Sequence, residues 1–200
     1  MWHEGIAGRG ANEINSCLYE YITSSSSDCS RLITFSDNCA AQNKSKHTVV
    51  MFLYSLSHSS KIEEIEHYYL EKGHTQNEND SVHSVIEHAS RNIPIFTPQK
   101  WYSVVRSARR VMPYTVVEMT GSLFYDFKDL SRKFRNFSMA ENGEKVQWHK
   151  ICRFKFLKGE SHVAYFSYGY DDDYNALDLL RKYQGLNCQR NRCSASSCHS

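Results

Sequence analysis

Between residues 11 and 91 the chain alternates helical and strand-like patterns, and this alternation restricts its possible folds more than any other feature. Apolar residues recur at helical spacing over 14–21, and a serine-rich loop separates them from a short, mostly apolar run at 32–36. Helices and strands that alternate across short connections are typical of a partly parallel sheet flanked by helices, which is the α/β class. The expected helices are 11–21, 43–56 and 77–91, and the expected strands are 32–36 and 62–70.

The pattern changes after Pro94, where we expect a further helix and then a small appended unit. The unit combines a strand, a helix and a hairpin across Lys158-Gly159-Glu160-Ser161, and the last residues are polar. We therefore expect a core over 1–112, a small α+β appendage over 113–185 and a flexible tail over 186–200. The elements expected here are a helix at 98–110, a strand at 114–119, a helix at 124–134 and hairpin strands at 148–157 and 162–168.

The composition fits one globular domain: 40% of the 200 residues are hydrophobic and 13% are aromatic. The 24 basic and 22 acidic residues give a net charge of +2, which neither requires nor excludes a nucleic-acid partner. The longest apolar run, 48–56, is too short to span a bilayer, and the polar opening residues do not form a signal peptide. Seven irregularly spaced cysteines favour free thiols, so we expect an intracellular protein, nuclear or cytoplasmic.

The motif Ser36-Asp37-Asn38-Cys39 stands at the carboxyl end of the first expected strand, where α/β sheets tend to bind ligands. Glu78 and Asp80 lie at the start of the helix that follows the second strand, so Asp37 and one of them can converge. Two carboxylates that converge in this way suit Mg²⁺ or Mn²⁺ and resemble a two-metal phosphoryl-transfer site.

Local structure offers a second explanation for the same acids. Thr75 and Glu78 form a capping-box pattern, Asp80 in a first turn favours the helix dipole, and Asp37-Asn38 suits a turn. Spacing alone leaves both readings open. Asp80 also shares one stripe of its helix with two further polar residues, His83 and Glu87.

Three segments of the chain resemble one large family of transposon-derived proteins, common in insects and other invertebrates, whose core is similar to the ribonuclease H-like fold of transposases and integrases. The likeness extends over roughly 1–170. The segments are Trp2-His3-Glu4-Gly5 with Gly8-Arg9-Gly10-Ala11-Asn12-Glu13-Ile14, Ser36-Asp37-Asn38-Cys39-Ala40-Ala41-Gln42-Asn43-Lys44, and 72–87.

The resemblance implies a partial ribonuclease H-like sheet in which Asp37 is the fourth-strand acid and Asp80, or next Glu78, is the helix acid. Mg²⁺ or Mn²⁺ would be the cofactor, bound by Asp37 and Asp80, and DNA would be the partner. The residues expected to support the metal ligands or to contact substrate are Asn38, Gln42, His74, His83 and Glu87.

The first strand of that fold, with its acid, would lie before Trp2, so the core is expected to be truncated. The strand that ends at Asp37 would then lack a neighbour and expose an apolar edge. We expect a transposase-derived protein, once a metal-dependent nuclease or strand transferase, that does not cleave nucleic acid in this chain. The alternative is a non-catalytic module that binds nucleic acid or protein.

Other signals are weaker. The helix at 98–110 and its end carry Arg106, Arg109 and Arg110, which can contact phosphates but are also common on exposed helix faces. The spacing of Cys188, Cys193 and Cys198 lacks the paired form of zinc sites. Nothing in the sequence marks a base for a Cys or Ser nucleophile.

Overall fold

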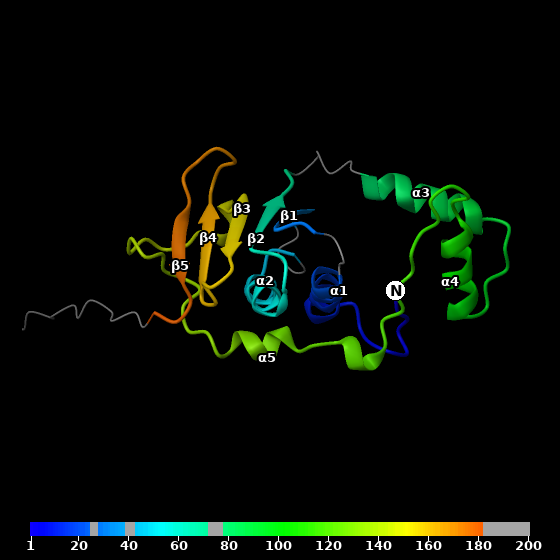
Figure 1. Cartoon of the computed structure of the whole chain (residues 1–200), viewed down its shortest axis with the longest axis horizontal. Coiled ribbons are helices and arrows are strands. Elements are labelled where there is room, and N and C mark those ends of the chain that lie inside the picture. Colours follow the sequence, from blue (N-terminus) through cyan, green and yellow to red (C-terminus); the bar gives the residue numbers. More distant parts are fainter. Residues whose placement is uncertain (25–27, 39–42, 72–77, 182–200) are drawn as a thin grey trace, which may run out of the picture.

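The computed structural model describes residues 1–24, 28–38, 43–71 and 78–181, with the backbone alone at 78–79. Within them, five strands form one mixed sheet in the order β1-β2-β3-β4-β5 (Figure 1). The strands are β1 (Arg31–Ser36), β2 (Glu64–Tyr69), β3 (Arg153–Leu157), β4 (Val163–Ser167) and β5 (Asn175–Asp178). The helices are α1 (Ala11–Ser24), α2 (Lys46–His58), α3 (Glu78–Ser90), α4 (Pro98–Ser107) and α5 (Phe127–Ser131), with 3-10 turns η1 (Gly121–Leu123) and η2 (Trp148–Lys150).

Local capping sets where the helices begin. The Ser45 side chain caps α2 by accepting from the Thr48 amide, and Thr97 caps α4 in the same way. In front of α1, the Glu13 carboxylate accepts from the Gly10 amide at 2.9 Å, which is the reciprocal half of a capping box. These contacts satisfy backbone donors that the helices themselves leave unpaired.

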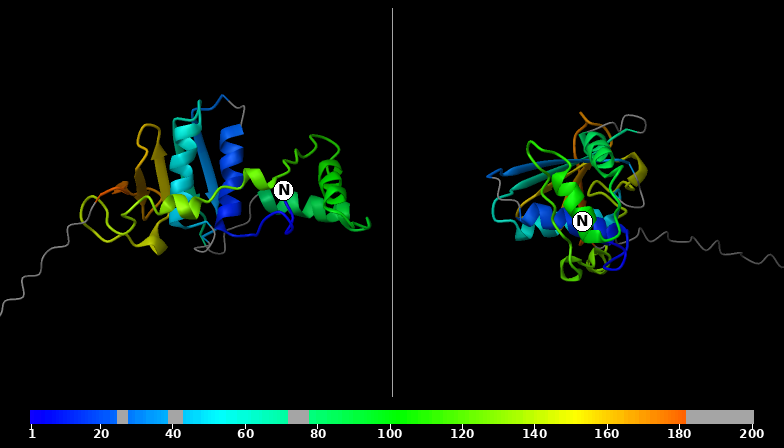
Figure 2. Two further views of the ribbon diagram at one scale, coloured as in Figure 1. Left: turned by 90° about the horizontal axis from the view of Figure 1, so that it is seen from below. Right: turned by 90° about the vertical axis from the view of Figure 1, so that its right-hand side faces the viewer.

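The sheet pairs β1 and β2 in parallel and every later neighbour antiparallel. Alternate residues on each strand face α1, α2 and α5, which lie together on one side (Figures 1 and 2). The core fills this side, with strand residues Ile65, Phe154 and Phe156 packed against helix residues such as Met51 and Phe52. We call the side away from these helices the open face. It is formed by Arg31, Ile33 and Phe35 of β1, Glu64, Glu66 and Tyr68 of β2, and Arg153, Lys155, Tyr165 and Ala176 of the remaining strands.

Helices α3 and α4 pack on each other and project beyond α1, at the end of the molecule away from β5 (Figures 1 and 2). Several large apolar side chains remain exposed in this part, and Phe96 is 89% exposed. No helix among the described residues is long and apolar enough to cross a membrane.

The expected α/β class is confirmed in its coarse form, as is the parallel pairing of the first two strands. The boundary expected at residue 113 does not divide the sheet, because β3 pairs with β2 and places Phe154 and Phe156 in the same core as Ile65. The expected strand at 114–119 is wrong: this segment forms neither helix nor strand and instead bonds the chain start, with the Met119 amide donating to the Met1 carbonyl. The helix expected at 124–134 is limited to α5, and the expected tail lies outside the described residues.

Candidate functional site

Asp37 directly follows β1, as the sequence predicts, and its side chain is exposed. Its carboxylate accepts a hydrogen bond from the side-chain amide of Asn43. The Asn43 carbonyl in turn accepts from the Tyr69 hydroxyl at 3.3 Å, which ties the segment after Asp37 to the end of β2. The hydrogen bonds of Asn43 therefore hold Asp37 in place at the end of β1.

Lys44 is the anchor of this region. It is only 5% exposed, and its Nζ donates to the Ile151 carbonyl at 2.7 Å and lies 4.6 Å from the centre of the Tyr69 ring. Burial lowers the pKa of the amine. The role of Lys44 is to hold the start of α2 against the segment that leads into β3.

The residues expected to join Asp37 lie on α3, where Asp80, His83 and Glu87 are all exposed. This helix packs chiefly against α4. Within the described part of the chain no three His, Cys, Asp or Glu side chains gather as metal ligands, so these residues do not by themselves fit a two-metal site. Asn38 is half-buried beside Asp37 in the sequence, whereas Gln42, His74 and the side chain of Glu78 lie outside the described residues.

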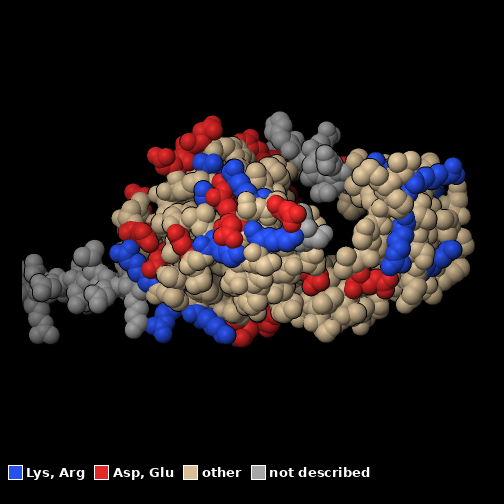
Figure 3. Space-filling view, viewed as in Figure 1, with Lys and Arg blue, Asp and Glu red and all other residues tan. Residues whose placement is uncertain are grey.

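The predicted arginines are on a separate part of the surface. Arg106 forms an ion pair with Glu118 at 2.6 Å, and Arg109 and Arg110 are exposed just after α4. In Figure 3 the surface over α3 and α4 carries several Lys and Arg side chains separated by uncharged atoms, whereas acidic and basic side chains alternate over the sheet. The arginines do not adjoin Asp37.

The open face carries a ladder of three aromatic rings that sequence reasoning missed. Phe35 stacks on Tyr68 with ring centres 5.4 Å apart and an interplanar angle of 25°. Tyr68 stacks on Tyr170 at 6.4 Å and 16°. Tyr170 comes from the β4–β5 connection and is held by its hydroxyl, which donates to the Tyr69 carbonyl at 2.7 Å. Phe35 ends the ladder at the sheet edge and is 64% exposed.

A charged network stands beside the ladder and centres on Glu66, which is 4% exposed. Its carboxylate bonds the Arg31 guanidinium at 3.1 Å and the Tyr68 hydroxyl at 2.7 Å. Burial alone would raise the pKa of Glu66, but these bonds and the charges of Arg31 and Lys155 hold it below its ordinary value. The Glu66 carboxylate thus fixes both the Tyr68 ring and the Arg31 cation.

Two further cations line the same face. Arg153 lies 4.3 Å from the centre of the Tyr174 ring and donates to the Asp172 carbonyl at 2.7 Å. Lys155 bonds Glu64 at 3.1 Å, while 27% of its side chain stays exposed. The face therefore presents stacked rings flanked by Arg31, Arg153 and Lys155. In each strand aromatic or charged residues alternate with core residues, and this alternation was the sequence signal for the open face. Only the strand register shows that the rings and cations of different strands lie side by side.

On the opposite side of the sheet, His67 is buried between β1 and α2. Its Nδ1 lies 2.8 Å from the Thr34 hydroxyl and its Nε2 lies 3.0 Å from the Ser36 hydroxyl. The Thr34 hydroxyl also donates to the Glu66 carbonyl at 3.2 Å and the Ser36 hydroxyl to the Asp37 carbonyl at 3.0 Å, so these contacts do not fix which ring nitrogen carries the proton. Burial lowers the pKa of His67 to about 4, so the ring is neutral near pH 7.

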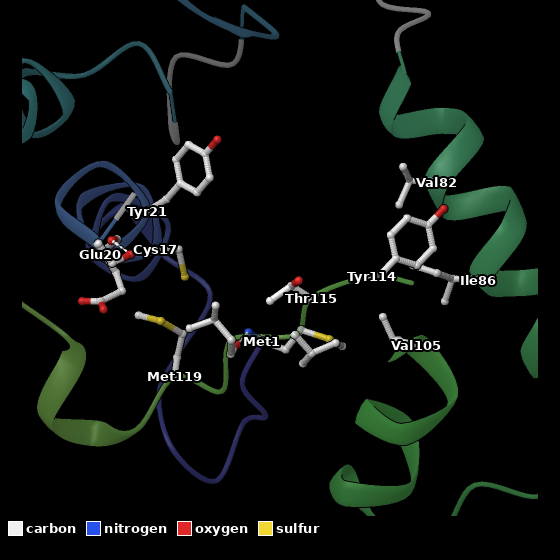
Figure 4. Close-up of a pocket in the computed structure, with 13 residues that line it drawn as sticks. Met1, Cys17, Glu20, Tyr21, Val82, Ile86, Val105, Tyr114, Thr115 and Met119 are labelled. Atoms are coloured by element: carbon white, nitrogen blue, oxygen red, sulfur yellow. Dashed lines mark hydrogen bonds between the residues drawn. The ribbon is translucent and has the colours of Figure 1, made fainter. Parts of the chain in front are cut away.

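An apolar cavity of about 410 Å³ separates α1 from α3 and α4 (Figure 4). Cys17 and Tyr21 of α1 line one side, and Val82, Ile86 and Val105 line the other. Burial raises the pKa of the Cys17 thiol, which is the opposite of what a reactive thiolate needs. The lining therefore gives no sign of nucleophilic chemistry at Cys17.

Comparison with known families provides one assignment. The family described as a domain of unknown function, DUF7869, matches residues 8–168. The chain belongs to this family. The match covers α1, the Asp37 segment, α3, β3 and β4, and so extends across both the open face and the predicted acidic residues. Comparison with curated proteins and with solved structures found no match.

Proposed function

We propose that this DUF7869 chain is a non-catalytic nucleic-acid-binding protein that holds a single strand on the open face of its sheet. The observation that carries the proposal is the ladder of Phe35, Tyr68 and Tyr170 beside three cations. Bases of any sequence can stack on aromatic rings, and the nearby cations can meet the phosphates.

The charge balance of the face supports stacking as the main source of affinity. Arg31 and Lys155 are partly neutralised by Glu64 and Glu66. Arg153 has no carboxylate within ion-pair distance among the described residues. A ligand held chiefly by rings and by few cations should show a shallow salt dependence.

A transposase-like, ribonuclease H-like ancestry is part of the same proposal. It is supported by the three segments quoted above and by an acid, Asp37, that ends one of two parallel strands. Mg²⁺ or Mn²⁺ would have been the ancestral cofactor. Because the described residues do not assemble a metal-ligand set, we derive no cleavage step. We expect no nicking or strand transfer with Mg²⁺ or Mn²⁺ above the level of Asp37→Ala, and activity above that control would show an enzyme.

Binding is tested by fluorescence anisotropy with a labelled single strand and the matching duplex. Phe35→Ser should weaken single-strand binding roughly 5- to 150-fold, the equivalent of one stacked base, about 1–3 kcal/mol. Phe96→Ser removes a still more exposed ring, 89% exposed against 64% for Phe35, on the α3–α4 part and is the control. Phe35→Trp should keep the affinity.

Two outcomes would contradict the proposal. One is a wild-type chain that binds no single strand. The other is an equal loss of affinity in Phe35→Ser and Phe96→Ser. A double change, Arg109→Gln with Arg110→Gln, locates the contact: a loss larger than that of Phe35→Ser would move the binding surface to α4.

A further inference from the structure

Within the part of the chain that the structure describes, the outer side of β1 is an unpaired sheet edge. Among the described residues β1 forms backbone hydrogen bonds only with β2. Every second residue of β1 makes these bonds. The carbonyls of Ser30 and Ser36 accept from β2-side amides, so the even-numbered residues bond inward. The backbone N–H and C=O groups of Arg31, Ile33 and Phe35 consequently point away from the sheet.

Apart from the charge of Arg31 at its start, this edge lacks the devices that usually prevent pairing. It runs for six residues without Pro, Lys or a bulge. Its two outward apolar side chains, Ile33 and Phe35, are 45% and 64% exposed on the open face. An edge of this kind pairs readily with another strand.

Two copies of β1 have complementary side chains when they run antiparallel to each other. If two copies of β1 align antiparallel about Thr34, Ile33 faces Phe35 of the other copy, and Arg31 faces Asp37 of the other copy. In this register each odd-numbered residue faces an odd-numbered residue of the other copy. The outward backbone N–H and C=O groups of one strand therefore meet those of the other. Apolar side chains fall opposite apolar ones and opposite charges face each other at both ends.

We propose that two copies of this chain associate through β1, forming one continuous ten-stranded sheet with a two-fold axis at Thr34. The pattern favours a second copy over an unrelated strand, because one segment supplies both halves of the apolar pair Ile33–Phe35, and Asp37 of one copy comes to lie beside Arg31 of the other, which already pairs with Glu64 and Glu66 in its own copy. The two open faces join on one side, so the ladders that end at Phe35 in each copy become neighbours. This inference does not depend on nucleic-acid binding, although Phe35 takes part in both.

The test uses two charge variants of the full chain, one with Ile33→Lys and Phe35→Lys, the other with Ile33→Glu and Phe35→Glu. In the proposed pairing residue 33 faces residue 35, so each variant repels itself while the two attract each other. Light scattering over a dilution series should give a dimer for wild type, a monomer for each variant and a dimer for their equimolar mixture. A matched control, Phe96→Lys with Val111→Lys, should remain dimeric because these exposed residues lie on the α3–α4 part.

A wild-type chain that stays monomeric at every concentration would overturn the proposal without any variant. So would charge variants that remain dimeric alone. A mixture that stays monomeric, when both variants keep the wild-type circular dichroism spectrum, would also overturn it. Tyr170→Ala separates this proposal from the function: it lies away from β1, so dimerisation should persist while single-strand binding falls.

Discussion

Acidification from pH 7 to pH 5 should weaken folding through a single buried side chain, His67. The ring is 3% exposed, both nitrogens are bonded to hydroxyls, and burial lowers its pKa from 6.5 to about 4. The unfolded chain therefore binds the proton first as the pH falls. The stability due to neutral His67 is complete above pH 6.5 and is lost progressively down to the folded pKa. The expected loss in the free energy of unfolding is about 2 kcal/mol at pH 5 and about 3 kcal/mol at pH 4.

Urea unfolding followed by circular dichroism at pH 7 and pH 5 measures this loss. His67→Gln keeps a polar side chain but removes the titration, so its stability should change between the two pH values by about 2 kcal/mol less than that of wild type. The variant should also be less stable at pH 7, by roughly 1–3 kcal/mol, because the hydroxyl contacts are only partly replaced.

His88→Gln is the matched control, since His88 is exposed in the last turn of α3. It should retain the wild-type response. Other groups also titrate: burial lowers the pKa of His47, and Glu66 loses its charge only below its own lowered pKa. The difference between wild type and His67→Gln above pH 5 isolates His67. An unchanged pH response in His67→Gln would refute the reasoning.

Two substitutions test the anchors of the fold by chemical unfolding. Lys44→Met should cost roughly 1–3 kcal/mol, because it leaves the buried Ile151 carbonyl without its donor, whereas Lys46→Met at an exposed position should cost under about 0.5 kcal/mol. Asn136→Ala should cost about 3 kcal/mol or more, since this 5%-exposed amide makes four hydrogen bonds, three to Ser138 and Met139 and one to the Asp178 carbonyl of β5. Asn142→Ala, with one exposed bond, should cost under about 1 kcal/mol. Equal losses in either variant and its control would contradict the corresponding assignment.

The first half of the fold could be predicted because its signals are local. The apolar spacing within α1, α2 and α3 and the run in β1 are each decided by residues close in sequence. Pairing across the chain is not local: the hairpin of β3 and β4 follows from the sequence, but no pattern in Arg153–Leu157 says that β3 also bonds β2. β5 has only a short apolar stretch around Leu177, and this stretch is recognisable as a strand only from its pairing with β4.

The candidate site divides in the same way. Asp37 is found at a strand end, where a local pattern placed it. The helix that should complete the acidic site was expected to flank the sheet, yet Val82 and Ile86 face the space beside Val105 of α4. The ring ladder combines Phe35, Tyr68 and Tyr170 from three distant segments, so it exists only once the register of the sheet is fixed.

The position of β3 in the sheet has a consequence for synthesis on the ribosome. β1, α2 and β2 emerge early and can form a small parallel unit, but the second neighbour of β2 is not made until Leu157 has been translated. During that interval both outer edges of the unit and the apolar residues that later meet Phe154 and Phe156 remain uncovered. Non-local pairing of this kind is slow and prone to aggregation. Fragments that end before β3 should therefore depend on chaperones, and expression of the chain should extend at least through β5.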